Sequence, residues 1–489
     1  MILRDYQEEA IAELRRHVGA GVKRLILQAS TGAGKTVCAA AMIRACHEKG
    51  RRALFIARGR ELIKRTSETL WDWKIPHGVI MAGEDDVAMA PVQVASKDTL
   101  ISWCIKRNKI PLPDADLVFL DESHESLGNT WVKLIDAYPN AVIVGLTATP
   151  ARSDGRGLGD MYDVMVQTRS TSKLIEEGWL VPAKVFAPYK PNLRGCPRAG
   201  ADWSVPALAE RMNKTQLVGN VVENWKTYGE GRKTFVYACD RRHGLALFEN
   251  FRAAGIASAY VDGKTPEEER DQVAAKLESG EITVVVNVMV YKQGVDIPCA
   301  SCCVLVRPTK SLVLYLQMIG RVRRPYPGKE RCVILDHSGA CFLHGMPDND
   351  IDWVLSPTQK IQKLQEERNK NVPKPICCPK CHCMFTGRAA CPNCGHVLQT
   401  RPRERQYKNG KLVEVPQGEH IERTLEAAQR YWTSCLYAMA NKRRSAGAAA
   451  HMFHKRFGQW PWQQQGLSNV PGRDDWKRPI TELYPKFAR

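Results

Sequence analysis

Short apolar runs alternate with amphipathic stretches along the first third of the chain. Each run is rich in valine, isoleucine and leucine, and a longer stretch with helical periodicity separates it from the next. Strands of this composition joined by helices form a parallel sheet that is covered on both faces. The predicted strands cover residues 24–28, 53–57, 92–95, 116–120 and 141–146. We therefore expect residues 1–166 to fold as an α/β lobe whose ligands gather at the carboxyl ends of the strands.

The same alternation begins again near residue 233. The predicted strands of this second set cover residues 234–238, 257–261, 283–287, 302–306 and 332–336. They predict a second parallel-sheet lobe over residues 229–340. Residues 167–228 would connect the two lobes, and the proline-rich run 182–200 within them predicts an irregular path.

A glycine turn stands between the first predicted strand and the helix that follows it. The sequence there is Ala-Ser-Thr-Gly-Ala-Gly-Lys-Thr, at positions 29–36. Such a turn leaves unpaired backbone N–H groups at the start of the helix, and these groups hold a phosphate. We expect the cradle to consist of Thr31, Gly32, Ala33 and Gly34. Lys35 would reach the β- and γ-phosphates of a nucleotide, and the Thr36 hydroxyl would ligate Mg²⁺.

Two carboxylates follow the predicted strand 116–120, namely Asp121 and Glu122. They would lie at the same edge of the sheet as the phosphate loop. Asp121 would hold Mg²⁺ through water, while Glu122 would orient and deprotonate the attacking water. The loop and the acidic pair together predict hydrolysis of ATP with Mg²⁺.

These motifs resemble those of the superfamily 2 helicases and translocases. Asp-Glu-Ser-His at 121–124 is a variant of the Asp-Glu-x-His box, and Leu-Thr-Ala-Thr-Pro at 146–150 resembles the Thr-Ala-Thr motif. The resemblance implies two tandem RecA-like lobes, with Arg4 and Gln7 bracketing the adenine. It also implies residues that couple the nucleotide site to the strand-binding face, here His124, Thr147 and Thr149.

The same resemblance implies contacts to the nucleic-acid backbone from the first lobe. The residues that match these segments are Arg60, Ser96 and Thr99. Each of them could instead be a helix cap or an ordinary surface residue, and the sequence leaves both interpretations open.

An arginine-rich motif closes the second lobe. Residues 317–324 read Gln-Met-Ile-Gly-Arg-Val-Arg-Arg and match the helicase motif Gln-x-x-Gly-Arg-x-x-Arg. The match assigns Gln317 to coupling and gives Arg321 and Arg324 the role of arginine fingers, which stabilise charge on the γ-phosphate. ATP would then lie between the two lobes.

A second motif of this lobe departs from the family pattern. Residues 293–296 read Gln-Gly-Val-Asp where the family has Glu-Gly-hydrophobic-Asp. Gly294 and Asp296 match the pattern and are expected near the nucleotide. Gln293 keeps an acceptor oxygen but lacks the negative charge.

Over residues 2–340 the chain is similar to the RadD-type DNA repair helicases and related helicases of bacteria and phages. The resemblance implies an ATP-dependent helicase or translocase that acts on DNA in repair, recombination or replication. Two alternatives within the motor class are a duplex-tracking translocase of the restriction type and an RNA helicase. A non-catalytic zinc-bearing nucleic-acid binder with a decayed ATPase fold is the alternative from another class.

Charge and cysteine content agree with a nucleic-acid partner inside the cell. The net charge of +19 favours a polyanion, and DNA is expected before RNA. The 17 cysteines are scattered through apolar strands, as reduced thiols are in the cytoplasm. We see no signal peptide or membrane span, and a replication, repair or nuclease protein could be a partner.

Two Cys-Pro-x-Cys knuckles follow a predicted linker over residues 341–372, and they define a zinc-binding segment over residues 373–400. Each knuckle brings two thiolates to one corner, as in structural Zn²⁺ sites. The expected ligands are Cys378, Cys381, Cys391 and Cys394, and the neighbours that could replace one of them are Cys377, Cys383 and His396.

The remaining residues, 401–489, form a tail with a predicted helix at 422–440 and basic residues interleaved with aromatic ones up to Trp462. Two interpretations stay open. The interleaved residues could grip a nucleic-acid strand by charge and base stacking. Alternatively, the aromatic side chains could form the core of a small helical domain.

Overall fold

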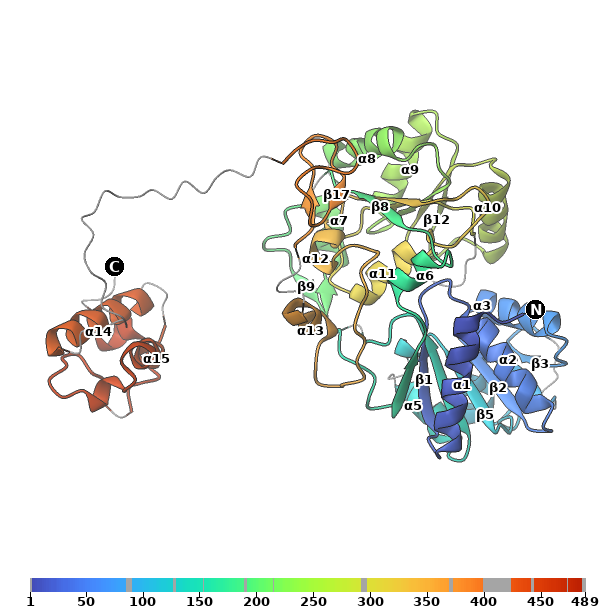
Figure 1. The fold of residues 1–489 in the computed structure, drawn as a ribbon, viewed down its shortest axis with the longest axis horizontal. Coiled ribbons are helices and arrows are strands. Elements are labelled where there is room, and N and C mark those ends of the chain that lie inside the picture. The colour runs from blue at the N-terminus through green and yellow to red at the C-terminus, as the bar shows by residue number, and fades with distance from the viewer. Residues whose placement is uncertain are drawn as a thin grey trace. The chain divides into compact units, whose positions relative to one another are not determined.

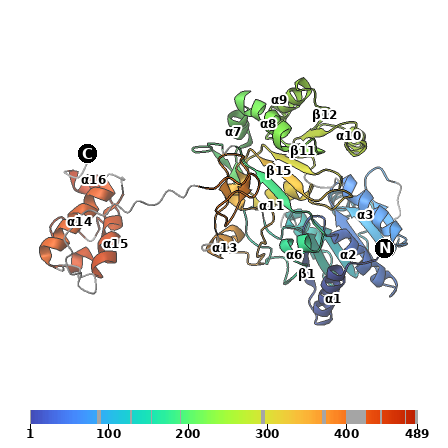
Figure 2. The same cartoon turned by 45° about the horizontal axis from the view of Figure 1, so that its top comes forward.

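The structure is a computed structural model. It describes residues 2–84, 90–125, 129–152, 154–188, 191–213, 215–291, 297–368, 373–398, 424–440, 444–472 and 474–485. Its contacts divide the chain into two compact units, Met1–Gln399 and Thr400–Arg489. The first unit holds two parallel sheets and the cysteine-rich segment, and the second is helical (Figures 1 and 2).

Seven parallel strands form the first sheet, in the order β3-β4-β2-β5-β6-β1-β7. Their bounds are β1 Arg24–Gln28, β2 Ala53–Ala57, β3 Gly78–Ile80, β4 Val92–Ser96, β5 Leu117–Asp121, β6 Val142–Thr147 and β7 Val164–Gln167. All five predicted strands are present, each to within one residue. The two edge strands, β3 and β7, were not predicted because they have only 3 and 4 residues.

Helices cover both faces of this sheet. Alternate side chains of each strand enter opposite cores, so that Leu25 and Leu27 lie in one core and Ile26 lies in the other. The helices on the first face are α1 (Asp5–Gly19), α2 (Lys35–His47) and α3 (Arg60–Asp72), and α5 (Asn129–Asp136) packs on the second face. Burial on both faces explains the continuous apolar runs.

Six parallel strands form the second sheet, in the order β12-β13-β11-β14-β15-β8. Their bounds are β8 Ala183–Phe186, β11 Thr234–Tyr237, β12 Ser258–Val261, β13 Val284–Asn287, β14 Cys302–Leu305 and β15 Cys332–Asp336. The helices on one face are α10 (Glu267–Ser279) and α11 (Leu312–Gly320), and those on the other are α8 (Thr215–Tyr228) and α9 (Arg241–Ala253).

Strand β8 differs from expectation, because it lies within the run 182–200 that was predicted to be irregular. Its 4 residues pair with β15 at the edge of the sheet. The adjacent proline and the short length hid the signal. The cysteine-rich segment covers this edge, with the Ala187 N–H donating to the His382 carbonyl at 3.0 Å.

Short elements complete the first unit. Before the second sheet they are helix α4 Lys97–Leu100, π-helix η1 Ile101–Lys106, 3₁₀-helix η2 Ser123–Glu125, α6 Thr171–Glu176, β9 Arg198–Ala199, β10 Asp202–Trp203 and α7 Val205–Met212. After it they are α12 Ala340–His344, α13 Ile361–Arg368, β16 Ile376–Cys377 and β17 Met384–Phe385.

Residues 346–361, which we call the return segment, pack back onto the first lobe. They lie within the predicted linker, yet they contact the loop that follows the Thr-Ala-Thr motif. The Gly157 N–H donates to the Ser356 carbonyl at 2.9 Å. A Cβ atom at Gly157 would lie 2.3 Å from the Val354 carbonyl oxygen, so this close approach requires glycine.

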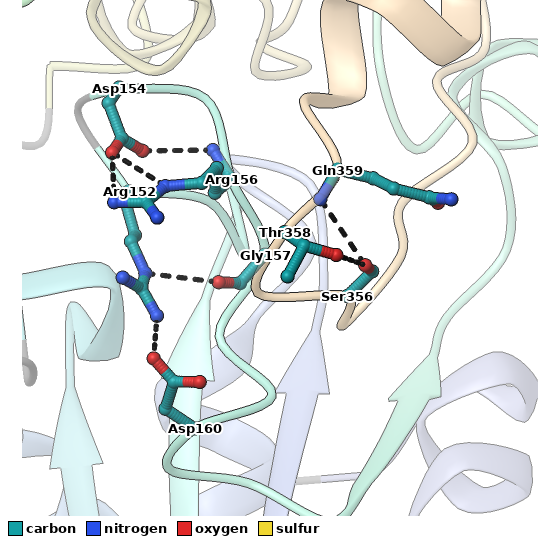
Figure 3. A network of polar contacts seen from close by, with 8 residues as sticks. All are labelled: Arg152, Asp154, Arg156, Gly157, Asp160, Ser356, Thr358 and Gln359. Atoms are coloured by element: carbon teal, nitrogen blue, oxygen red, sulfur yellow. Dashed lines mark hydrogen bonds and ion pairs between the residues drawn. The ribbon is translucent and has the colours of Figure 1, made fainter.

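Ion pairs fix the other side of that loop (Figure 3). Arg156 Nε donates to Asp154 Oδ2 at 2.8 Å, and Arg152 pairs with Asp160. The loop and the return segment therefore form one packed layer beside the first sheet.

The second unit contains α14 (Leu425–Ala440), α15 (Ala446–Phe457), the 3₁₀-helix η4 (Pro461–Gln463) and α16 (Ile480–Leu483). Its core includes Trp432 and Phe453, both fully buried. These two side chains have the core role that one interpretation of the tail predicted. Within the part of the chain that the structure describes, no helix has the length and apolar character needed to cross a membrane.

Candidate nucleotide site between the two lobes

The phosphate loop adopts the backbone that its glycines allow. Gly32 and Gly34 have φ values of +92° and +83°, in the left-handed region, and helix α2 begins at Lys35. The Gln7 side chain donates to the Ala33 carbonyl at 3.1 Å. A Cβ atom at Gly34 would lie 2.3 Å from Gln7 Nε2, so the close fit requires glycine there.

The two predicted adenine residues have different surroundings. Arg4 lines the cavity beside the loop, and its guanidinium lies over the Trp179 ring, 4.1 Å from the centroid. Gln7 is buried against the loop itself. Sequence analysis missed Trp179 and also Tyr6, whose hydroxyl donates to the Ala33 carbonyl at 3.0 Å. No local pattern around Trp179 signals its contact with Arg4, whereas Tyr6 stands between Arg4 and Gln7 in the same short segment.

The acidic pair ends strand β5. Asp121 is its last residue, and its Oδ1 accepts from the Glu122 N–H at 2.9 Å. Glu122 has φ +48°, a left-handed conformation that is uncommon for residues other than glycine and costs free energy. Burial, reinforced by the neighbouring Glu122 carboxylate, raises the pKa of Asp121, while Lys35 and Arg321 act to lower it. The folded structure thus holds both carboxylates close to these cations.

His124 connects the acidic motif to the second lobe. Its Nδ1 lies 3.3 Å from Glu122 Oε2 and 3.1 Å from Thr147 Oγ1, and its Nε2 lies 3.2 Å from Gln317 Nε2. Because the Gln317 amide donates, the ring accepts at Nε2 and carries its proton on Nδ1. Thr147 Oγ1 in turn accepts from the Thr149 N–H at 3.0 Å. All four predicted coupling residues therefore form one hydrogen-bonded chain.

The end of α11 rests on the phosphate loop. A Cβ atom at Gly320 would lie 2.7 Å from Thr31 Cβ, and one at Gly32 would lie 3.0 Å from Arg324 Cγ. The cavity formed there has a volume of about 480 Å³. The predicted site residues among its lining are Arg4, Thr31, Gly32, Gly34, Lys35, Thr36, Asp121, Glu122, Arg321 and Arg324.

The middle arginine of the motif has a different partner. Arg323 is buried, and its guanidinium donates to Asp348 Oδ1 at 2.8 Å and to the Pro347 carbonyl at 2.8 Å. Asp348 belongs to the return segment and also accepts from the Ala183 N–H at 3.1 Å. Burial raises the pKa of Asp348, and the Arg323 charge opposes that shift. Sequence analysis missed this ion pair because its two residues come from a motif and a presumed linker.

The predicted strand-binding residues all have contacts within the protein, and Arg60 also reaches the second lobe. Ser96 caps α4 by accepting from the Thr99 N–H at 3.4 Å, and both side chains are buried. Arg60 donates to the Ala82 carbonyl at 2.6 Å and lies 3.6 Å from Glu267 of α10. The capping interpretation thus accounts for Ser96. Gly294 and Asp296 lie outside the residues that the structure describes.

The four expected zinc ligands form one cluster. Among the described residues, the Sγ atoms of Cys378, Cys381, Cys391 and Cys394 lie within 4.8 Å of one another. Although burial acts to raise it, the Asn393 amide donor lowers the pKa of the Cys381 thiol to about 7. Four such sulfur donors fit a tetrahedral metal ion. Cys377 instead points to the Ala187 carbonyl, at 3.4 Å.

Two family patterns match the chain in tandem. The family described as type III restriction enzyme, res subunit, matches residues 1–152, and the helicase conserved C-terminal domain matches residues 213–325. They cover strands β1 to β6 of the first sheet and β11 to β14 of the second, and they include the residues from both lobes that line the cavity. The chain belongs to the superfamily 2 helicases. Members of this superfamily hydrolyse ATP, and the cavity between the lobes is where this helicase has its phosphate loop, acidic pair and arginines.

Three relatives extend this result. A 51.5 kDa protein of a Lactococcus phage is 28% identical, over 83% of this chain and 85% of its own length. The ATP-dependent helicase IRC3 of Saccharomyces cerevisiae is also 28% identical, but this chain spans only 57% of that protein. The ATP-dependent DNA helicase uvsW of Enterobacteria phage T4 is 24% identical, over 68% of this chain and 67% of its own length.

Solved structures give the same fold. A fragment of an HsdR subunit of a type I restriction enzyme from Vibrio vulnificus matches with a TM-score of 0.56 and 22% identity. The match covers 71% of this helicase and 67% of that chain.

Replacing Asp348 by Asn should destabilise the arginine motif. The substitution removes the negative partner of the buried Arg323 guanidinium. Breaking a buried ion pair costs about 3–5 kcal/mol, and the partial exposure of Asp348 reduces this to about 2 kcal/mol. We expect that loss in the free energy of unfolding by urea titration, together with a roughly tenfold lower kcat for ATP because the neighbouring arginines shift.

Asp114→Asn is the matched control. Asp114 forms an exposed ion pair with Arg52 at 2.6 Å. Such pairs contribute less than about 1 kcal/mol. Equal stability and equal kcat in Asp348→Asn and Asp114→Asn would contradict a positioning role for the return segment.

Proposed function

We propose that this helicase is a DNA motor that hydrolyses ATP in the cavity between its lobes. The observation that carries the proposal is that Lys35, Glu122, Arg321 and Arg324, which come from separate motifs, line one cavity. A nucleotide there would touch both lobes at once, so its hydrolysis can change how the lobes sit together.

On the first lobe, the backbone N–H groups of the loop and Lys35 hold the β- and γ-phosphates. Thr36 and Asp121 would hold Mg²⁺, which when bound neutralises charge on the phosphate oxygens. Glu122 accepts the proton of the attacking water. Its contact with His124 orients the carboxylate, and the left-handed backbone at Glu122 aims it from the end of β5.

On the second lobe, Arg321 and Arg324 stabilise the charge that develops as the γ-phosphate leaves. The chain from Glu122 through His124 to Gln317 links the water-activating carboxylate to α11. When the γ-phosphate leaves, Glu122 on the first lobe and the arginines on the second lose a shared partner. The contacts between the lobes therefore weaken, and the lobes can shift along a bound strand. Gly294 and Asp296 are proposed to contribute from the same lobe.

The adenine is proposed to lie beside Arg4, with Gln7 holding the loop in register. The contact between Arg4 and Trp179 keeps the guanidinium at the rim of the cavity. An adenine ring would stack on this planar group, as guanidinium groups do on aromatic faces.

DNA is the proposed track. The net charge of +19 suits a polyanion, one relative is named a DNA helicase, and the first family takes its name from a restriction enzyme. Arg60, Ser96 and Thr99 remain proposed backbone contacts, and Ser96 also caps α4. A cytoplasmic location and a repair or nuclease partner belong to the same proposal. The test compares ATPase activity with single-stranded DNA, duplex, forked DNA and RNA at several salt concentrations.

A duplex-tracking translocase is the second candidate. It is favoured by the match of residues 1–152 to a restriction-enzyme subunit. Displacement of the third strand from a triplex, without separation of a forked duplex, would support it. Strand separation would support the helicase.

Lys35→Ala and Glu122→Gln should each abolish the motor. The first removes the phosphate-binding cation and the second removes the general base, so DNA-stimulated kcat should fall by about 10²–10⁴-fold. Lys49→Ala and Glu48→Gln change exposed residues of the same charge and should leave kcat unchanged. Normal ATP hydrolysis by Lys35→Ala or Glu122→Gln would contradict the proposed roles of these residues. It would favour the alternative of a non-catalytic nucleic-acid binder.

We also propose that the four-cysteine cluster binds one structural Zn²⁺. Four thiolates leave no open position, so the ion would stabilise the segment that covers the β8 edge. Cys391→Ser should lose the bound zinc, measured per chain by elemental analysis, because one of four ligands is gone. Cys377→Ser is the control and should retain it. Equal zinc content in the two variants would contradict the ligand set.

A further inference from the structure

The aromatic residues of the second unit fall into two groups. Trp432 and Phe453 are buried in its core. Trp460 is only partly buried, and Trp462 is 51% exposed. Trp460 still packs against that core, so a core role leaves Trp462 unexplained.

Trp460 and Trp462 form a stacked pair, which two further rings approach at an angle. Trp460 and Trp462 are nearly parallel, with an interplanar angle of 9° and centroids 4.8 Å apart. His454 lies 4.3 Å from Trp460, and Trp476 lies 4.7 Å from Trp462 at 63°. We call these four residues the aromatic row. Parallel rings at such a spacing resemble stacked bases.

The backbone holds the row in place. Pro461 stands between the two tryptophans in the sequence and is buried at the first position of η4. The Gln463 N–H donates to the Trp460 carbonyl at 2.9 Å, and the Trp460 N–H donates to Gln463 Oε1 at 2.8 Å. These hydrogen bonds fix the turn that carries the two indoles, which lowers the entropic cost of binding.

Two exposed cations are sequence neighbours of residues of the row. Lys455 follows His454 in sequence, Lys477 follows Trp476, and both lysines are exposed. Two nearby carboxylates face Arg478, which lies 3.1 Å from Asp475 and 3.9 Å from Glu482, while Asp474 is exposed. Over residues 424–489 the sequence has 11 Lys and Arg against 4 Asp and Glu.

We propose that the aromatic row is a binding site for single-stranded nucleic acid, separate from the motor. An unpaired base stacks on the exposed face of Trp462, and the bordering lysines contact the phosphates on either side. Stacking on an aromatic ring tolerates any base, because every base has a flat face. In duplex DNA these faces are already stacked on neighbouring bases, so the site selects unpaired bases. The site would keep the chain on a displaced or gapped strand while the motor cycles.

The test uses the full chain without nucleotide and a fluorescein-labelled oligo(dT) of about 20 nucleotides, with binding followed by anisotropy at several salt concentrations. Trp462→Ala should weaken binding by about tenfold, since one stacked base is lost. Trp462→Phe should retain most of the affinity. Trp71→Ala is the matched control because Trp71, on α3, is 58% exposed, and its affinity should equal that of the wild type.

The remaining measurements separate this site from the motor and from a structural role. Binding to a blunt duplex and thermal unfolding should be the same in Trp462→Ala and the wild type, and ATPase kcat at saturating DNA should be unchanged. Absence of any DNA-stimulated ATPase in the wild type would overturn the proposed motor but not this site. If Trp462→Ala left the affinity for oligo(dT) unchanged, the proposed site would be wrong. The exposed Trp462 indole would then be assigned to a contact with another protein.

Discussion

The contact between the end of α11 and the phosphate loop is the constraint on which the site depends. Gly320 lies against Thr31 so closely that a methyl group would not fit, and the aliphatic part of Arg324 meets Gly32. Two glycines, one from each lobe, thus allow the arginine motif to lie against the phosphate loop. If α11 lay farther from the loop, the arginines would be surrounded by water, where the attraction between a guanidinium and a phosphate is weak.

Packing from outside the two motifs maintains that approach. Asp348 of the return segment forms an ion pair with Arg323. Ser356 of the same segment accepts a hydrogen bond from the loop after the Thr-Ala-Thr motif. One stretch of chain therefore touches the arginine motif of the second lobe and the loop that follows the Thr-Ala-Thr motif of the first. It is placed to transmit a change at one motif to the other, since packed elements shift as units.

Much of this arrangement could be predicted from the sequence. Buried parallel strands are continuous apolar runs, so both sheets were located, and the phosphate loop, the acidic pair and the arginine motif carry their chemistry in consecutive residues. The four-cysteine cluster was also predicted residue by residue, because a knuckle places its thiolates locally. Edge strands such as β8 were missed, since short strands lack a periodic signal.

Contacts between residues far apart in the chain could not be predicted. Nothing near Asp348 indicates that it pairs with Arg323, and nothing near Trp179 indicates that it meets Arg4. The split of the tail aromatics into a core and an exposed row likewise depends on how α15 and η4 pack. Tertiary packing decides such matters, and a local pattern does not contain it.

The most direct test of the shared site is a single-turnover measurement of ATP hydrolysis by Arg324→Ala, with nucleotide affinity measured on the same protein. If the second lobe completes the site, ATP still binds within a few-fold of the wild-type affinity, while the rate of hydrolysis falls by about 10³-fold or more. Hydrolysis at the wild-type rate would show that the first lobe works alone and would contradict the account.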